Sequence, residues 1–214
     1  MPHLSLPIKA TDQSPFLVYI SFEDDNNELI SLIKKSNLKD FTLMIISGFN
    51  WDEDLTPYPA SPIYKGEHYL GKAQETYKWI EEQITESIKG LNKEPSIYGI
   101  IGYSISGLFA FTSSYFSSKF SLIASCSGSL WYPDLLTWIN SKKTLITPKK
   151  VYLSLGDKEK ETKNPVLSSV EERTLQIKDY LEKKDIPCLF EFNPGNHFKN
   201  VPLRVFKGIK NLLS

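Results

Sequence analysis

The chain has 214 residues, of which 41% are hydrophobic, and it carries 25 basic and 25 acidic side chains. This length and apolar content suffice for one sizeable core, so we expect a single domain over residues 1–214. The balanced charge, with basic pairs scattered along the chain, argues against a nucleic-acid partner or an anionic membrane surface.

The predicted elements alternate between strands and helices. In chain order they are a strand over 15–22, a helix over 26–37, a strand over 41–48, a polar, proline-rich loop over 49–69, a helix over 71–91, a strand over 96–103, a helix to about 116, a strand over 120–128, a short helix over 133–142, a strand over 150–156, a helix over 165–184, a strand over 188–195 and a helix over 202–213. Asn164 and Pro165 supply a cap and a first-turn proline for the helix that ends near Lys184. This alternation predicts a mostly parallel sheet with helices on both faces.

One serine follows a predicted strand in a setting that suits a nucleophile. Ligands of such sheets bind at the carboxyl ends of the strands, and Ser104 lies there in "GYSISG", between Gly102 and Gly107. Small neighbours allow a tight strand-to-helix turn that exposes the hydroxyl, although a plain turn has the same composition. The usual G-x-S-x-G pattern is imperfect here, because Ser106 takes the place of the second glycine. Serine is small enough to keep the helix close to the strand.

A serine nucleophile needs a base, and the base needs an orienting acid. Of three histidines, His3 lies in an N-terminal tail without a predicted element and His68 lies at the end of the long loop. His197, in "FNPGNHFKN", follows the last strand, where the general base of an α/β-hydrolase is found. The acid should follow the penultimate strand, and "GDKEKETKNP" offers Glu159 as first choice and Asp157 as second, the latter able to hold the turn instead.

An acyl-transfer site also needs backbone N–H groups that bind the developing oxyanion. The N–H of Ile105, directly after the nucleophile, is one expected donor. The loop after the strand over 41–48 is expected to supply the other, from Phe49, Asn50 or Trp51. That loop is long for a compact domain and carries aromatic side chains, which we expect to form a wall over the site.

The motifs together resemble a known family. "GYSISGLFAF", "SCSGSLWYP", "LSLGDKEKETKNPV", "FNPGNHFKN" and "NWDEDLTPYPA" are similar to the esterase branch of the α/β-hydrolase superfamily that includes the enterochelin (siderophore) esterases. The resemblance implies a three-layer α/β-hydrolase fold without a large cap domain. It also implies a Ser–acid–His hydrolase in which Ser104, His197 and Glu159 match the family positions, with no metal or organic cofactor. Trp131, Tyr103 and Trp51 are then expected to bind the substrate.

The chain departs from the family pattern in Ser106 and in lacking the N-terminal recognition domain of larger siderophore esterases. We therefore expect a small or medium ester or thioester as the small-molecule substrate. The same three residues would also serve an acyltransferase, and a non-catalytic binding protein of this fold is a further alternative. A phosphate-binding turn at "GYSISG" is disfavoured, because no lysine or second glycine cluster completes it.

The remaining features concern location. Cys126 and Cys188 lie far apart without metal-ligand spacing, which favours a reducing compartment. The N-terminus lacks the basic region and apolar core of a signal peptide, and no apolar run approaches the length that spans a membrane. We therefore expect a cytoplasmic protein.

Overall fold

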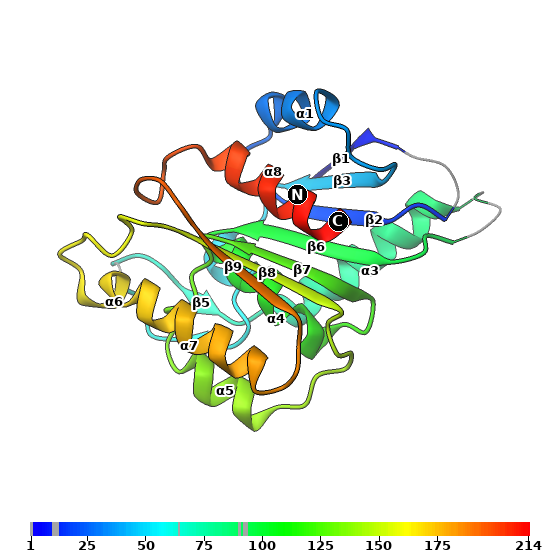
Figure 1. Ribbon diagram of the computed structural model, residues 1–214. Coiled ribbons are helices and arrows are strands. Elements are labelled where there is room, and N and C mark those ends of the chain that lie inside the picture. The colour runs from blue at the N-terminus through cyan, green and yellow to red at the C-terminus, as the bar shows by residue number, and fades with distance from the viewer. Residues whose placement is uncertain (1, 10–12, 64, 90, 92–93) are drawn as a thin grey trace.

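The computed structural model describes residues 2–9, 13–63, 65–89, 91 and 94–214. Within these residues a seven-stranded sheet has the order β1-β3-β2-β6-β7-β8-β9, and a separate two-stranded sheet joins β4 and β5 (Figure 1). All neighbouring strands of the large sheet run parallel except β1, which is antiparallel to β3. The strands are β1 (His3–Ile8), β2 (Phe16–Ile20), β3 (Thr42–Ser47), β4 (Pro59–Ala60), β5 (Tyr69–Leu70), β6 (Tyr98–Tyr103), β7 (Phe120–Cys126), β8 (Lys150–Gly156) and β9 (Cys188–Asn193).

Helices cover both faces of the large sheet, which confirms the predicted α/β class. In Figure 1, α1 and α8 lie above the sheet, and α3, α4, α5 and α7 lie below it. The helices are α1 (Asn27–Lys34), α2 (Trp51–Asp54), α3 (Ala73–Ile88), α4 (Ile105–Phe116), α5 (Leu135–Ser141), α6 (Pro165–Ser168), α7 (Val170–Glu182) and α8 (Val201–Leu213).

The central strands separate two apolar cores, one on each face. On β6, Ile100 packs into the core beneath α3 and α4, whereas Ile101 packs into the core beneath α1 and α8. Both side chains are fully buried. A strand buried on both faces needs apolar residues at successive positions, which is why these strands read as continuous hydrophobic runs.

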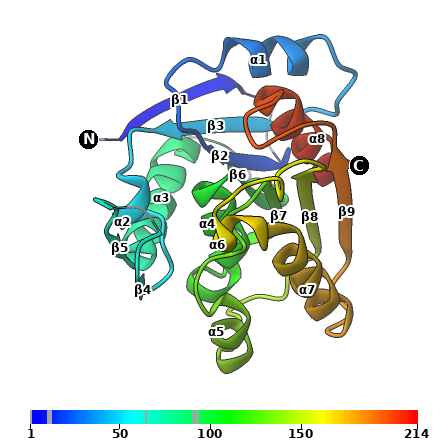
Figure 2. The same ribbon diagram turned by 90° about the vertical axis from the view of Figure 1, so that its left-hand side faces the viewer.

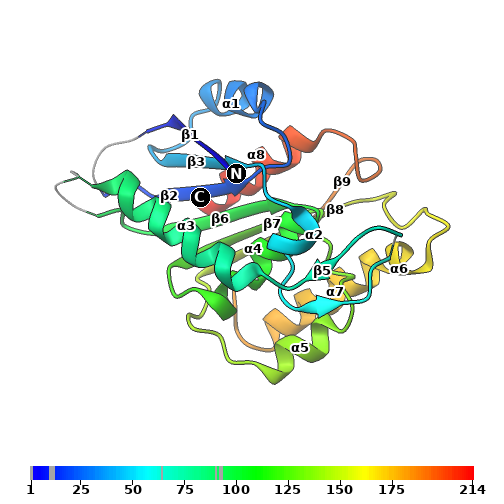
Figure 3. The same ribbon diagram turned by 180° about the vertical axis from the view of Figure 1, so that it is seen from behind.

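Three segments differ from the predicted elements. β1 forms where no element was predicted. It is an edge strand with half of its residues exposed, and it was not predicted because its sequence shows no apolar run. The predicted helix over 165–184 is broken at Ser169 into α6 and α7. The Asn164 cap is confirmed, since its side-chain oxygen accepts hydrogen bonds from the N–H groups of Val166 and Leu167. The predicted loop over 49–69 contains α2 and the short β4–β5 pair, which lie beside α3 and α4 in Figure 3.

Helix α8 approaches the sheet closely because of Gly208. A Cβ at this position would lie 2.9 Å from Cys126 Sγ and 3.2 Å from Ala124 Cβ. We expect Gly208→Val to lower the free energy of unfolding by about 1–3 kcal/mol, since the helix must move away from the sheet. Urea denaturation tests this, with Lys210→Val at an exposed position of the same helix as control. Equal stability of the two variants would contradict the close packing.

Candidate active site

The turn between β6 and α4 holds Ser104 in a backbone conformation that is rare outside glycine. Ser104 has φ of 59° and ψ of −124°, so its main chain is strained. A Cβ at Gly102 would lie 1.8 Å from the carbonyl oxygen of Ser106, and one at Gly107 would lie 2.8 Å from the Cα of Gly128. Both glycines are therefore required by close backbone contacts around the turn.

Ser106, which departs from the usual pattern, is fully buried inside this turn. Its hydroxyl oxygen accepts a hydrogen bond from the N–H of Tyr103 at 2.9 Å and lies 2.8 Å from the carbonyl oxygen of Ile20, to which it can donate. The side chain thus ties the turn to the end of β2. A glycine at this position would lack both contacts.

The imidazole of His197 lies between the serine and a carboxylate. Its Nε2 is 3.1 Å from Ser104 Oγ, and its Nδ1 is 2.7 Å from Glu159 Oε2. His197 belongs to the loop between β9 and α8, and Glu159 belongs to the turn after β8. Figure 2 looks at the end of the sheet where these two loops meet. Of the other histidines, His3 lies in the edge strand β1 and His68 precedes β5, and both are exposed.

Glu159 is buried, with 3% of its side chain exposed. Its Oε1 accepts hydrogen bonds from the N–H of Gly156 at 2.6 Å and from Arg204 at 2.9 Å, which leaves Oε2 to face His197. Burial by itself would raise the pKa of Glu159, but the hydrogen bond and charge of His197 and the N–H of Gly156 outweigh it and lower the pKa below its ordinary value. The carboxylate is therefore ionised at neutral pH.

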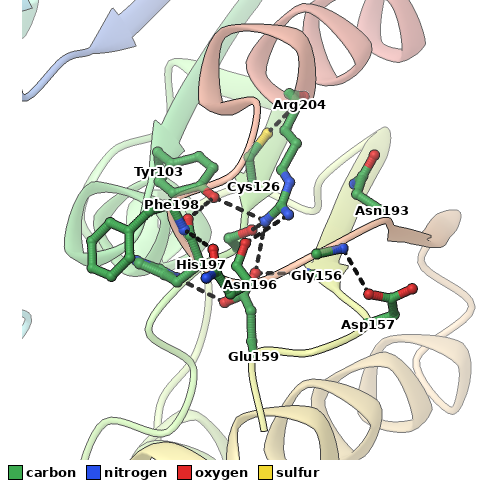
Figure 4. A network of polar contacts seen from close by, with 12 residues as sticks. Tyr103, Cys126, Gly156, Asp157, Glu159, Asn193, Asn196, His197, Phe198 and Arg204 are labelled. Carbon is green, nitrogen blue, oxygen red and sulfur yellow. Dashed lines mark hydrogen bonds and ion pairs between the residues drawn. The ribbon is translucent and has the colours of Figure 1, made fainter. Parts of the chain in front are cut away.

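Asp157, the second candidate for the acid, holds the neighbouring turn. Its Oδ1 accepts a hydrogen bond from the N–H of Gly195 at 2.7 Å (Figure 4). Gly195 has φ of 99°, a conformation that favours glycine. The two acids thus act on the same loop in different ways: Asp157 binds its backbone, and Glu159 binds the imidazole.

Arg204 is a buried residue of the site that the sequence interpretation did not single out. It lies in the first turn of α8, and its side chain is 1% exposed. Its guanidinium donates to the Tyr103 hydroxyl at 3.0 Å, to Ser127 Oγ at 2.9 Å and to Glu159 Oε1 at 2.9 Å (Figure 4). In the sequence, Arg204 resembles any other cation of an amphipathic helix. Its helical register relative to Val205 and Gly208 was not recognised as a sign of burial.

The strand order places a different loop beside the Ser104 turn than the one expected to supply the second oxyanion donor. β2, and not β3, is the neighbour of β6, and the parallel register pairs Ile20 with Gly102. The loop after β2 therefore runs alongside the Ser104 turn, whereas the loop after β3 lies one strand further away. In that more distant loop, the N–H of Asn50 donates to Asp54 Oδ2 at 2.9 Å and is already satisfied. The Phe49 ring packs edge-on against Trp79.

Ile105, whose N–H is the first expected donor, directly follows Ser104. It is the first residue of α4, and the first N–H groups of an α-helix have no carbonyl partner within that helix. Its N–H follows the Ser104 carbonyl, which itself accepts hydrogen bonds from the N–H groups of Leu108 and Ser129.

The three residues expected to bind substrate have different surroundings. Tyr103 is buried, and its hydroxyl donates to the carbonyl of His197 at 2.6 Å, so it supports the loop and offers no free face to a substrate. Trp51 contacts the ring of Phe22 edge-on at 5.1 Å between ring centroids. Trp131 lines a groove of about 430 Å³ together with Pro165 and Val166 of α6.

Two further observations concern metal binding and membrane-spanning helices. Among the described residues, no group of three or more His, Cys, Asp or Glu side chains is arranged to hold a metal ion. In the same part of the chain, the helices are too short or too polar for any of them to cross a membrane.

The lowered pKa of Glu159 predicts a pH dependence of stability. Ionised Glu159 contributes stability that is fully present above its pKa in the unfolded chain, about 4.3, and is lost as the pH falls through its lower pKa in the folded state. We expect the free energy of unfolding to fall less steeply below about pH 4 in Glu159→Gln than in the wild type. Urea denaturation at a series of pH values measures the slopes, and Glu182→Gln, which changes an exposed helix pair, should keep the wild-type slope. Identical slopes for wild type and Glu159→Gln would contradict the ion pair.

No protein-family model matches the chain. In a comparison with curated proteins, it is 27% identical over 193 residues to the uncharacterized protein YbbA of Bacillus subtilis (strain 168), a match that covers 83% of this chain and 76% of that protein.

Several solved structures are similar over nearly the whole chain. An IroE-like serine hydrolase from Shewanella oneidensis has a TM-score of 0.80 at 20% identity, with 99% of this chain and 75% of that chain covered. Siderophore hydrolase EstA from Aspergillus nidulans has a TM-score of 0.68 at 17% identity, with 100% and 90% covered. The enterobactin esterase FES from Shigella flexneri has a TM-score of 0.69 at 14% identity, with 99% and 55% covered. The chain therefore has the α/β-hydrolase fold that its motifs predicted, and it shares this fold with serine hydrolases and siderophore esterases.

Proposed function

We propose that the protein is a serine hydrolase that cleaves a carboxylic ester or thioester through an acyl-enzyme. The single observation that carries the proposal is the position of the His197 imidazole, with Nε2 3.1 Å from Ser104 Oγ and Nδ1 2.7 Å from Glu159 Oε2. These are the contacts that a nucleophile, its base and the orienting acid require. The shared fold with serine hydrolases supports the same reaction class.

In the proposed reaction, neutral His197 accepts the proton of Ser104 Oγ as that oxygen attacks the substrate carbonyl. The tetrahedral intermediate collapses, the bond to the leaving alcohol or thiol breaks, and the imidazolium donates its proton to that group. A water molecule then attacks the acyl-enzyme with His197 again as the base, which releases the acid and restores Ser104. Glu159 keeps the Nδ1 proton in place and stabilises the imidazolium.

For the oxyanion we propose the N–H groups of Ile105 and Phe22 as donors. Ile105 begins α4 directly after the nucleophile. Phe22 lies two residues beyond Ile20, and Ser104 lies two residues beyond its register partner Gly102, so continuation of the pairing sets Phe22 opposite Ser104. The N–H of Ser21 is bonded to the carbonyl of Ile46 at 2.8 Å, and that bond leaves Phe22 as the first residue of the loop whose N–H can face the site.

The groove next to Trp131 is our proposed binding site for the acyl or alcohol part of the substrate. The N–H of Ser129 donates to the carbonyl of Ser104 at 2.9 Å, and Trp131 follows two residues later, which is at most about 7 Å of chain. Several of the similar proteins are named for siderophores. From them we extend to this chain only the cleavage of an ester of small or medium size.

The assignment of the nucleophile predicts the loss of activity in Ser104→Ala. We expect kcat for p-nitrophenyl butyrate to fall about 10⁴-fold or more, because the acyl-enzyme can no longer form. A fluorophosphonate probe should label the wild type stoichiometrically and leave Ser104→Ala unlabelled. Circular dichroism checks that both proteins are folded.

Wild-type turnover by folded Ser104→Ala would show that another residue is the nucleophile. A wild type that neither turns over esters nor reacts with the probe would instead support a non-catalytic binding protein. Adding an alcohol or amine acceptor separates hydrolysis from acyl transfer by the distribution of products.

The proposed oxyanion donor predicts a contrast between two substitutions at one position. Phe22→Pro deletes the backbone N–H, whereas Phe22→Ala keeps it and removes only a side chain that is 73% exposed. We expect Phe22→Pro to lower kcat about 10²- to 10³-fold relative to Phe22→Ala. Thermal unfolding of both variants controls for damage to the loop. Equal kcat in two folded variants would remove Phe22 from the oxyanion site.

A further inference from the structure

The guanidinium of Arg204 occupies the point where the segments of the candidate site meet. Arg204 extends from α8 toward the turn after β8 and the loop after β9 (Figure 4). It is the largest fully buried side chain among the described residues. Burial of a cation costs free energy unless its donors are paired. The partners of Arg204 therefore indicate its role in the site.

On the acid side, Arg204 fixes one oxygen of Glu159. Nη1 donates to Oε1 at 2.9 Å, and the N–H of Gly156 donates to the same oxygen at 2.6 Å. With Oε1 held by two donors, the carboxylate cannot rotate without breaking both contacts. Oε2 is therefore kept toward Nδ1 of His197 at 2.7 Å.

On the base side, the same guanidinium fixes the loop that carries the imidazole. Nη2 donates to the carbonyls of Pro194 at 3.3 Å and Asn196 at 2.8 Å, the latter directly before His197. Nη1 also donates to the hydroxyl of Tyr103 at 3.0 Å, and that hydroxyl donates a hydrogen bond to the carbonyl of His197 at 2.6 Å. The backbone is thus held on both sides of the His197 peptide.

We propose that Arg204 is the positioning residue of this site. It sets the distance and angle between the Glu159 carboxylate and the His197 imidazole by donating hydrogen bonds to the carboxylate and to the loop that carries the imidazole. The inference rests on the proposed function, since it assigns Arg204 a role in the same reaction. Arg204 touches neither the substrate nor Ser104. It acts through Glu159 and through the loop over 194–197.

Only arginine suits these contacts. Its planar fork reaches a carboxylate, two hydroxyls and two carbonyls from one centre, whereas a lysine ammonium has three donors around one nitrogen. Lysine would keep the charge and lose part of the fork. Charge and geometry can therefore be separated by comparing Arg204→Lys with Arg204→Met.

The experiment compares Arg204→Met, Arg204→Lys and Lys207→Met. Lys207 provides a matched control, because it lies on the same helix and pairs with Glu191 at 2.6 Å without contacting His197. We expect Arg204→Met to lower kcat about 100-fold with KM nearly unchanged. Arg204→Lys should lose at least about 10-fold in kcat, again with KM nearly unchanged. Lys207→Met should match the wild type in both kcat and KM.

A double-mutant cycle tests whether Arg204 acts through the acid. In Glu159→Gln, the further change Arg204→Lys should lower kcat by a smaller factor than it does in the wild type, because only the contacts with the loop over 194–197 remain to be lost. Additive effects would overturn the proposal, and so would wild-type kcat in Arg204→Lys. If Arg204→Met fails to fold, Arg204→Lys and the double-mutant cycle still test the proposal.

The NMR signal of the His197 Nδ1 proton separates this inference from the proposed function. It is recorded in Ser104→Ala, which needs no turnover, with and without Arg204→Lys. A shifted or lost Nδ1 proton signal in the folded Arg204→Lys variant supports the positioning role, because it reports a changed contact between Nδ1 and Glu159. An unchanged signal in that folded variant overturns it, even if the esterase assay succeeds.

Discussion

The candidate site depends on one buried carboxylate that faces a guanidinium cation through one oxygen and an imidazole through the other. Glu159 meets Arg204 at 2.9 Å through one oxygen and His197 at 2.7 Å through the other. An ionised carboxylate without such partners would be strongly disfavoured in this surrounding. Arg204 lies on α8, and the close packing of this helix at Gly208 fixes its position on the sheet. The distance between the Glu159 carboxylate and the His197 imidazole therefore depends on how α8 packs against the sheet.

The serine is positioned by a different means, namely backbone contact. Its strained conformation is held by the parallel pairing of β2 with β6 and by Ser106, whose hydroxyl links Tyr103 to Ile20. These contacts lie within the rigid sheet, where each strand is fixed by its neighbours. Ser104 is thus held by strand register and Glu159–His197 by buried charge, and Tyr103 connects the two parts through its bonds with Ser106, Arg204 and the carbonyl of His197.

The sequence was most informative for candidate site residues that follow a predicted strand. Ser104 directly follows β6, Glu159 follows the end of β8 by three residues and His197 follows the end of β9 by four, and parallel strands bring their carboxyl ends to one edge. The strand order was not accessible, because β2 inserts between β3 and β6 although it precedes both. The second oxyanion donor was therefore expected in the loop after β3, whereas the donor that we propose follows β2. Arg204 was missed because a charged residue on an amphipathic helix is usually exposed, and its burial results from tertiary packing alone.

The loop over 194–200 shows why polar contacts, and not apolar packing, decide the geometry of the base. Phe198 is 83% exposed, and the loop therefore gains little from burial. Its backbone is held instead by Asp157 at Gly195 and by Arg204 at Asn196. Directional bonds from several elements fix a peptide more narrowly than apolar contacts do, since each has a preferred angle as well as a distance. In the reaction that we propose, His197 serves both Ser104 and the leaving group and needs that precision in orientation, which an exposed loop can supply only through such bonds.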